Sequence, residues 1–203
     1  MPTKQTDLTR EKLLSAAFCE IHRHGFQAAS IANILQDTGL TKGALYHHFP
    51  NKRDLGLAVI DEVIRERLDG LIFRRIYESP EPVTALLQVI GDIGNSRDAA
   101  FVELGCPLNN LMQEMSPLDK DFKLRLNGVL GTFGRVVEDA LVRGRDTGVL
   151  RADVDCRAAA LFIVSAWEGC VGVAKSLQST DSFSMCMAQL QAYVLGLMAA
   201  PSA

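Results

Sequence analysis

The sequence has 203 residues, enough for one large core or for a small module joined to a larger one. Hydrophobic residues make up 48% and charged residues 22%, the balance of an ordinary globular protein. No apolar run reaches the roughly 18 residues that span a bilayer, and the first ten residues carry no apolar signal segment, so we expect a soluble, cytoplasmic protein without membrane partners.

Five cysteines stand at irregular spacing and include no CxxC pair, which indicates reduced thiols rather than a disulfide framework or a zinc ribbon. The net charge of −3 is unevenly distributed. Residues 1–60 hold seven Lys and Arg against five Asp and Glu, and all four histidines, whereas the remaining 143 residues hold fourteen against nineteen. A mildly basic first part on an acidic second part suggests that only the first part meets a polyanion.

Sustained period-2 alternation and Asn-Gly or Asp-Gly hairpin turns are missing, which predicts an all-α protein. An apolar stripe predicts a first helix over residues 8–24, and Gly25 is a natural stop for it. Ser30 can cap a second helix that runs through Gln36 and ends at Gly39. The first helix thus ends at Gly25, and the second begins after Ser30.

A short third helix can begin after Thr41. Pro50 must terminate it, because proline lacks an N–H and disfavours helix in the residue before it. Asn51 can cap a fourth helix that continues through the segment LGLAVIDEVIRERLDGLIFRRI. Two short helices joined by a turn that contains glycine, and braced by a longer helix, describe a helix-turn-helix unit.

The apolar periodicity of the second part of the chain predicts longer helices. We predict them over residues 82–103, from Pro107 to near Ser116, over 118–147, from Asp153 or Asp155 to about Leu177, and over 182–199.

The helical period separates two faces of the short third helix. Leu45 and Phe49 lie four residues apart and should point to the core, with Ala44 near the boundary between the faces. Lys42 and Tyr46 also lie four apart, on the opposite face. That face is therefore predicted to be available to a partner.

The start of this helix has the chemistry of a phosphate site. Gly43 removes a side chain where another surface could come close, and exposed N–H groups at a helix start suit an anion. The hydroxyls of Thr41 and Tyr46 and the ammonium groups of Lys42 and Lys52 are also good phosphate donors. A metal site at the adjacent histidines is disfavoured, because neighbouring helical residues diverge by about 100°.

The segment SIANILQDTGLTKGALYHHFPNKRDLGLAVI, residues 30–60, resembles the DNA-binding signature of the tetracycline repressor (TetR) family. The positions that match are Ser30, Ile34, Gly39, Lys42, Gly43, Leu45, Tyr46, Phe49, Lys52 and Leu55. Leu35 and Thr38 depart from the pattern, which often has alanine there, so the packing of the two short helices is expected to differ.

The resemblance implies a homodimer whose recognition helices enter successive major grooves of a roughly palindromic operator. Carried over by position, the residues that would contact phosphates are Ser30, Thr41, Tyr46 and Lys52. Those nearest the base edges would be Lys42, Gly43, Ala44 and His47, whereas His48 would lie on the side of the first helix. The resemblance further implies a helical second domain with a small-molecule cavity, and a dimer interface built by the last two helices.

The second part offers no chemistry that indicates an enzyme, a metal site or a cofactor. It has no histidine, no Gly-rich phosphate loop and no GxSxG. Its paired carboxylates, such as Asp153 and Asp155, stand at predicted helix starts, where capping explains them. The two last predicted helices are apolar nearly all round and contain small residues, which favours helix association over membrane insertion because Glu168, Lys175 and Gln189 interrupt them.

Aromatic and thiol side chains suggest an apolar cavity for a small hydrophobic or aromatic effector. The candidates are Phe101, Cys106, Asn110, Phe122, Phe133, Phe162, Trp167 and Cys170. Pro107 suits a first helical position, so Cys106 lies at or beside the helix start, where a thiolate is stabilised. Residues 103–116 also resemble a TetR branch with a Gly-Cys pair, some members of which sense electrophiles or oxidants through a cysteine. An inert buried cysteine is the alternative. The other cysteines, Cys19, Cys156, Cys170 and Cys186, are expected to be packing residues.

The sequence thus predicts a helix-turn-helix DNA-binding domain over residues 1–50 and a larger helical ligand-binding and dimerisation domain over residues 51–203. The predicted function is a ligand-responsive transcriptional regulator, most simply a repressor that an apolar effector releases from its operator. A repressor that senses electrophiles or oxidants through Cys106 is the alternative.

Overall fold

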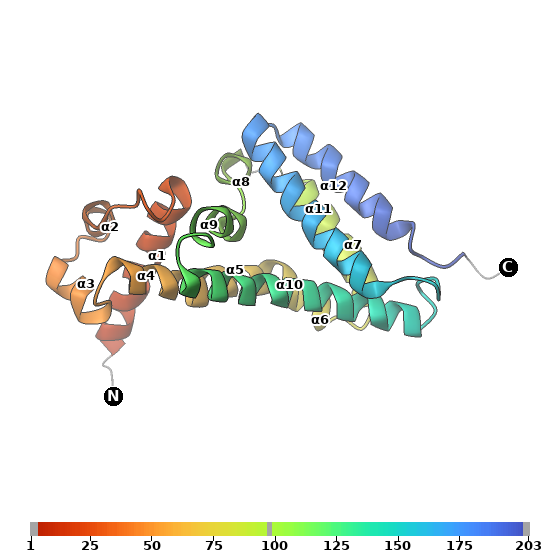
Figure 1. Ribbon diagram of the computed structural model, residues 1–203, viewed down its shortest axis with the longest axis horizontal. Coiled ribbons are helices and arrows are strands. Elements are labelled where there is room, and N and C mark those ends of the chain that lie inside the picture. Colours follow the sequence, from red (N-terminus) through yellow and green to blue (C-terminus); the bar gives the residue numbers. More distant parts are fainter. Residues whose placement is uncertain (1–3, 97–98, 201–203) are drawn as a thin grey trace. The chain divides into compact units, whose positions relative to one another are not determined.

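The computed structural model describes residues 4–96 and 99–200, and it is all-α as predicted (Figure 1). Within those residues the extended pairing is limited to one isolated antiparallel bridge, between Leu150 and Met198. The elements are α1 (Lys4–His24), α2 (Ile31–Thr38), α3 (Lys42–His48), α4 (Lys52–Ala58), the π-helix η1 (Val59–Ile64), α5 (Arg65–Leu68), the π-helix η2 (Asp69–Phe73), α6 (Arg74–Tyr77), α7 (Pro82–Gly94), α8 (Ala99–Leu104), α9 (Pro107–Met115), α10 (Lys120–Asp146), α11 (Cys156–Leu177) and α12 (Thr180–Leu195).

The predicted caps are confirmed. The side chains of Ser30, Thr41, Asn51 and Asp155 each accept a hydrogen bond from a backbone N–H in the first turn of the helix that follows. These bonds satisfy N–H groups that have no partner inside the helix. Gly39 ends α2 with φ 67°, in the left-handed region that glycine adopts without a steric penalty.

The prediction of one helix over 82–103 is wrong. α7 ends at Gly94, where the N–H of Asn95 donates to the carbonyls of Gly91 and Ile93, and α8 begins only at Ala99. Asn and Ser side chains compete with helical hydrogen bonds and favour caps and turns, which explains a break at this point. Residues 97–98, which the prediction also covered, lie outside the described residues.

The fourth helix runs on as predicted, in a continuous helical stretch from Lys52 to Tyr77. Two π-helical segments, η1 and η2, interrupt its α-helical geometry. Such wider turns are rare and often lie at functional positions. Here they flank Arg65–Leu68, in which the chain passes from one compact unit of the molecule to the other.

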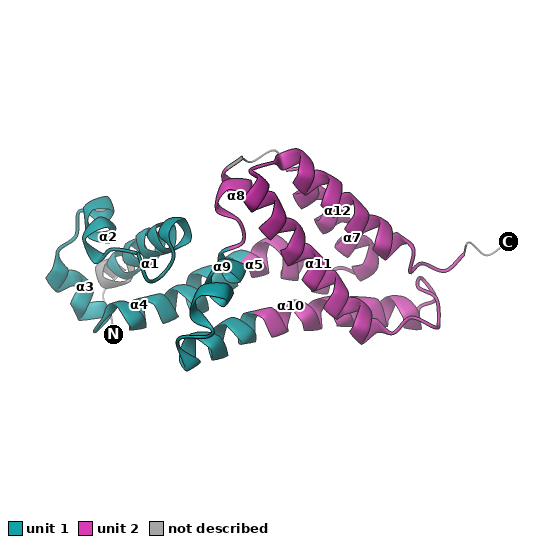
Figure 2. Cartoon of the chain, turned by 45° about the horizontal axis from the view of Figure 1, so that its top comes forward, with its two compact units in different colours: residues 1–67, 107–129 teal, residues 68–106, 130–203 magenta. Residues whose placement is uncertain are grey.

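Figure 2 shows the two compact units in different colours. Unit 1 contains residues 1–67 and 107–129, and unit 2 contains residues 68–106 and 130–203. Residues 51–67 and 107–129 are therefore compact with the first three helices. The sequence-based division after residue 50 into a DNA-binding and an effector domain remains a functional prediction.

The core of unit 1 forms around α1, against which α2, α3, α4 and η1 pack. Leu13, Ala17, Leu45 and Leu55 are fully buried there. At Gly56 of α4, an added Cβ would lie 2.5 Å from the Phe26 ring and 2.9 Å from the Phe122 ring. A larger residue there would have to displace one of these two packed rings.

The core of unit 2 forms where α12 packs on α7 and α11. Among the described helices, α11 is long and apolar enough to cross a membrane by length and composition, but 44% of its most apolar stretch is buried inside the molecule. Core helices of soluble proteins pass the same test, so α11 is weak evidence for a membrane protein.

The expectation of reduced thiols is wrong for two of the five cysteines. Cys170 of α11 and Cys186 of α12 form a disulfide with a Cα–Cα distance of 5.6 Å. The sequence could not indicate this pair because packing of two separate helices brings it together. Cys19 was expected to pack in the core and is instead exposed, whereas Cys156 is buried as expected.

The disulfide should stabilise unit 2. It closes a loop of 16 residues, so its reduction is expected to lower the free energy of unfolding by about 3 kcal/mol. Urea unfolding with and without dithiothreitol measures this, and a Cys186→Ser variant should not respond to the reductant. Thiol titration in denaturant should find three thiols before reduction, those of Cys19, Cys106 and Cys156. Five thiols in the unreduced protein would contradict the bond.

Candidate nucleic-acid interface

The short helix α3 is held by one face and exposed on the other. Leu45 is 0% and Phe49 3% exposed, as the periodicity predicts. The exposed side chains on the other face include Lys42, Tyr46 and His47, and Tyr46 keeps 49% of its surface accessible. These three side chains are therefore accessible to a partner.

The start of α3 is exposed. Gly43 is exposed, and an added Cβ there would meet only the Thr41 hydroxyl oxygen, at 3.8 Å. The Thr41 hydroxyl accepts a hydrogen bond from the N–H of Ala44, which is half-buried at the boundary between the two faces. The hydroxyl hydrogen of Thr41 can still be donated to a partner outside the helix.

A buried carboxylate fixes the start of α2. Glu20 of α1, which is 5% exposed, accepts hydrogen bonds from the Ser30 N–H and the Asn33 side-chain amide, both at 2.9 Å. The Ser30 hydroxyl meanwhile accepts from the N–H of Ala32. Sequence analysis missed Glu20, because a single acidic residue in an amphipathic helix gives no signal of burial.

The two departures from the family pattern are accommodated locally. Leu35 is buried, with 9% of its surface exposed. The hydroxyl of Thr38 donates to the carbonyl of Leu35 and accepts from the N–H of Leu40. The larger side chains thus pack inward or close the turn between α2 and α3.

Lys52, predicted to contact phosphate, has partners within unit 1. Its ammonium group donates to the carbonyl of Gln27 at 2.9 Å and lies 4.9 Å from the centre of the Phe26 ring. Burial lowers the pKa of this amine, and the nearby carboxylates of Glu114 and Glu20 oppose that shift. Lys52 therefore braces the turn before α2, and a phosphate contact from it remains a prediction.

The predicted effector residues are divided between the two compact units. Asn110 and Phe122 belong to unit 1, where Phe122 is fully buried and packs on Phe26 with a ring distance of 4.6 Å. The other six belong to unit 2. Their role as ligand contacts remains a prediction.

Two of the six make an aromatic cluster in the core of unit 2. Phe133 lies 5.5 Å from Phe73 and 5.5 Å from Trp167, the latter in an edge-to-face arrangement that suits aromatic pairs. Phe101 packs on Phe183 at 5.4 Å.

The remaining residues of unit 2 in this set have different surroundings. Phe162 is 50% exposed and packs on Tyr193 with a ring distance of 4.5 Å, so it lies at the surface of unit 2. Cys170 is bonded to Cys186 and offers no thiol. A ligand contact by either residue remains a prediction.

Cys106 stands immediately before α9, as predicted, but its thiol is buried and engaged. It is 7% exposed, and its Sγ donates to Oε1 of Glu168 at 3.4 Å. Burial raises the pKa of Glu168 to about 7, against a smaller opposing effect of the Cys106 hydrogen bond. Sequence analysis treated Glu168 only as an interruption of an apolar helix.

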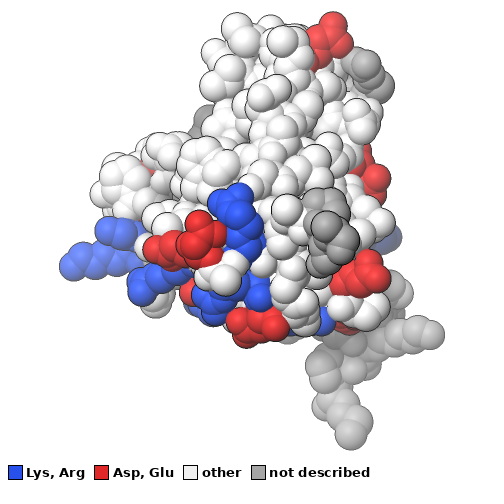
Figure 3. Space-filling model, turned by 90° about the vertical axis from the view of Figure 1, so that its right-hand side faces the viewer, with Lys and Arg blue, Asp and Glu red and all other residues white. Residues whose placement is uncertain are grey.

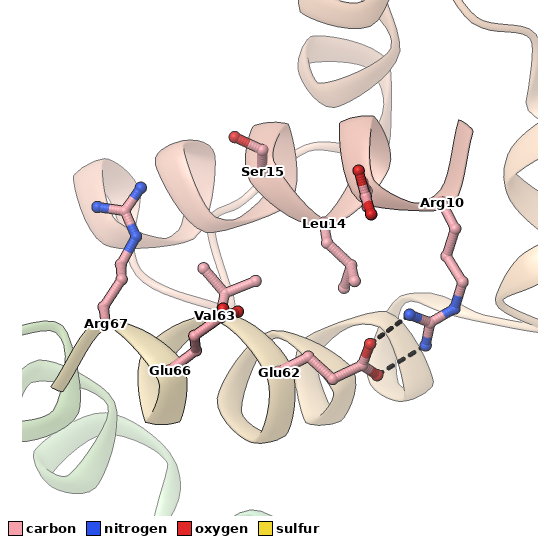
Figure 4. Close-up of a pocket in the computed structure, with 8 residues that line it drawn as sticks. Arg10, Leu14, Ser15, Glu62, Val63, Glu66 and Arg67 are labelled. Atoms are coloured by element: carbon pink, nitrogen blue, oxygen red, sulfur yellow. Dashed lines mark hydrogen bonds and ion pairs between the residues drawn. The ribbon is translucent and has the colours of Figure 1, made fainter. Parts of the chain in front are cut away.

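Two hollows were found that none of the eight predicted effector residues lines. One, of about 740 Å³, lies between α1 and the helical stretch η1–α5 of unit 1, where Arg10 forms an ion pair with Glu62 (Figure 4). The other, of about 320 Å³, lies in unit 2 beside Tyr77, Asp139 and Arg143. Charged side chains line both, so neither is the apolar cavity that the sequence suggested.

Comparison with known proteins decides the family. Residues 13–59 match the family described as bacterial regulatory proteins, tetR family, and residues 82–190 match the one described as tetracyclin repressor-like, C-terminal domain. The chain belongs to the TetR family. It is a transcriptional regulator with a helix-turn-helix DNA-binding domain, and the families and relatives that it matches are regulators rather than enzymes.

The sequences of known relatives align with this TetR-family regulator over most of its length. Transcriptional regulator AcuR of Cereibacter sphaeroides is 31% identical over 170 residues, 83% of this chain and 77% of that protein. The transcriptional repressor DhaR of a Mycobacterium species is 24% identical over 72% of each chain. The crystal structure of a regulatory protein TetR from Rhodobacter sphaeroides has a TM-score of 0.81 and 28% identity, covering 92% of this chain and 98% of that one.

The buried carboxyl of Glu168 should make the stability of the regulator depend on pH. The folded-state pKa of about 7 lies above the ordinary value of 4.5, so folding favours the protonated carboxyl. The stability that this group contributes is therefore fully present below about pH 4.5 and is lost as the pH rises through about 7. Glu168→Gln keeps an acceptor for Cys106 and removes the charge. In urea unfolding we expect it to be more stable than wild type by about 3 kcal/mol at pH 8 and by about 1 kcal/mol at pH 5, with the difference vanishing below about pH 4. If the difference in stability between Glu168→Gln and wild type did not change with pH, the burial of this carboxyl group would be contradicted.

Proposed function

We propose that this regulator is a cytoplasmic repressor that binds a palindromic operator as a homodimer through α3 and that a small apolar effector releases it. The observation that carries the proposal is the division of α3 into a face anchored by Leu45 and Phe49 and an exposed face with Lys42, Tyr46 and His47. A recognition helix needs this division, because anchored residues fix the side chains that read the major groove.

The exposed groups of α3 match the chemistry of a duplex. Lys42 and the Tyr46 hydroxyl suit phosphate oxygens, whereas His47 and the bare backbone at Gly43 suit close contact with base edges. Ser30 and Thr41 add hydroxyl donors at the starts of α2 and α3. Ala44, half-buried, supports a contact only with its methyl group.

Removal of the exposed polar groups on α3 should weaken operator binding. Lys42→Ala and Tyr46→Ala are each expected to reduce affinity about tenfold, and Lys42→Ala should lower the slope of log affinity against log salt by about one. Electrophoretic mobility shift with DNA from upstream of the protein's own gene, or with a duplex selected by the wild type, measures both. Lys123→Ala, an exposed lysine on α10, is the matched control and should change nothing. Unchanged affinity in both α3 variants would show that another surface binds DNA.

An apolar surface on α11 and α12 supports the dimer. Figure 3, which looks from the side where the chain ends, shows a broad area without charged side chains above a charged band. Large apolar side chains of these two helices that are at least half exposed are Leu161, Phe162, Val173, Leu177, Met185 and Leu195. Burial against a second copy would remove this surface from water.

Charges placed on this surface should separate the protomers. Leu161→Glu and Met185→Glu, at side chains 70% and 71% exposed, are expected to shift sedimentation to the monomer and to weaken operator binding with it. Leu124→Glu, at a side chain 72% exposed on α10, is the control with the same charge and similar exposure, and it should remain dimeric. If Leu161→Glu and Met185→Glu both sediment like wild type, the interface lies elsewhere.

The described contacts favour an effector of apolar character over a thiol sensor. Phe73, Phe133 and Trp167 give unit 2 an aromatic interior. Cys106 is buried, and a thiol that donates to Glu168 must keep its proton to do so. Reactive cysteines are partly exposed and lie in electropositive surroundings, which Cys106 beside a carboxyl group lacks.

A further inference from the structure

Unit 1 contains a segment that lies far from the DNA-binding helices in the sequence. Residues 107–129, which comprise α9 and the first part of α10, follow the unit 2 helices α7 and α8 but are compact with α1 to α4. This segment contacts the turn between α1 and α2 and the start of α4. Those are the two chain segments that precede and follow the helix-turn-helix pair.

The contact with the turn between α1 and α2 is made by Glu114 of α9. Its Oε2 accepts a hydrogen bond from the N–H of Phe26 and its Oε1 accepts one from the N–H of Gln27, each at 2.8 Å. The carboxylate also lies against Gly25, whose φ is 81° and where an added Cβ would approach Oε2 to 2.9 Å. One side chain thus uses both of its oxygens on consecutive backbone donors, in charge-assisted bonds that are stronger than neutral ones.

Other contacts make this turn a fixed part of the DNA-binding unit. The Phe26 ring packs on Phe122 of α10 at 4.6 Å, and the Lys52 ammonium donates to the carbonyl of Gln27. The N–H of Ala29 donates to the carbonyl of Gly25 and closes the turn one residue before the α2 cap. A displacement of Glu114 would therefore pass directly to the start of α2.

The same segment also holds the chain after α3. Arg53, in the first turn of α4, donates to both carboxylate oxygens of Asp119 at 2.6 and 3.0 Å, and to Asp121 at 2.5 Å. The hydrogen bond from Arg53, with the N–H groups of Phe122 and Asp121, lowers the pKa of Asp119 to about 2. The ion pair therefore stays intact throughout the neutral pH range.

We propose that Glu114 is a positioning residue for DNA binding, which clamps the α1–α2 turn so that residues 107–129 set the orientation of α2 and α3. The clamp makes operator affinity depend on the position of α9, a helix whose sequence begins directly after Cys106 at the passage from unit 2. The inference rests on the proposed function, since it concerns how firmly α3 is presented to an operator.

The test compares variants of the full chain that differ at Glu114. Glu114→Ala removes both acceptors, whereas Glu114→Gln keeps the shape of the side chain but leaves a single acceptor oxygen. Gln113→Ala, at the exposed neighbouring position on α9, is the matched control. The probe is a DNA duplex that the wild-type protein selects from a random pool.

The clamp predicts a graded loss of affinity. Glu114→Ala should bind the duplex roughly tenfold to a hundredfold more weakly, Glu114→Gln less weakly, and Gln113→Ala as tightly as wild type. Affinity is measured well below the melting temperature of each variant and is expressed per folded molecule. If Glu114 only stabilised the fold, the affinity measured in this way would not change. Hydrogen exchange should be faster at the amides of Phe26 and Gln27 in both Glu114 variants and unchanged in the control.

The outcomes separate this inference from the function on which it rests. Wild-type affinity in folded Glu114→Ala, with the two amides exchanging faster, would overturn the clamp while leaving operator binding in place. Unchanged exchange at both amides would equally overturn it. Failure of the wild type to enrich any duplex would overturn the proposed function and this inference together.

Discussion

A helix of seven residues does not hold itself together in water, so α3 depends on the burial of Leu45 and Phe49. These two side chains fix the axis and the rotation of the helix, and everything on its outer face follows from them. Pro50 stops the helix directly after the second anchor, and Asn51 starts the next. The exposed groups of α3 thereby gain a defined direction although they make few contacts of their own.

The anchors work because unit 1 is assembled from two separate stretches of the chain, residues 1–67 and 107–129. Close packing at Gly56 lets Phe26 and Phe122 meet beside α4, and Glu114 holds the adjacent backbone turn. The DNA-binding helices are thus supported by α9 and α10, which sequence analysis assigned to another domain.

Unit 2 combines a packed aromatic interior with an apolar exterior on its last two helices. α11 carries Trp167 on its buried face and Leu161 on its exposed face, which explains why its sequence is apolar nearly all round. Because of this composition and its length, α11 also resembles a membrane-spanning helix. α11 nevertheless packs on α12, and its Glu168 accepts a hydrogen bond from Cys106, as expected of a helix in a protein core.

The sequence by itself determined the helical class, the caps at Ser30, Thr41 and Asn51, and the two faces of α3, because capping and periodicity are local and depend on neighbours within one or two turns. The signature in residues 30–60 also indicated the family. Only the tertiary structure decided that Cys170 meets Cys186, that Cys106 meets Glu168, and that Glu114 reaches the turn at Phe26. These pairs lie 16 to 88 residues apart, and no local pattern records a contact that exists only after separate helices have packed.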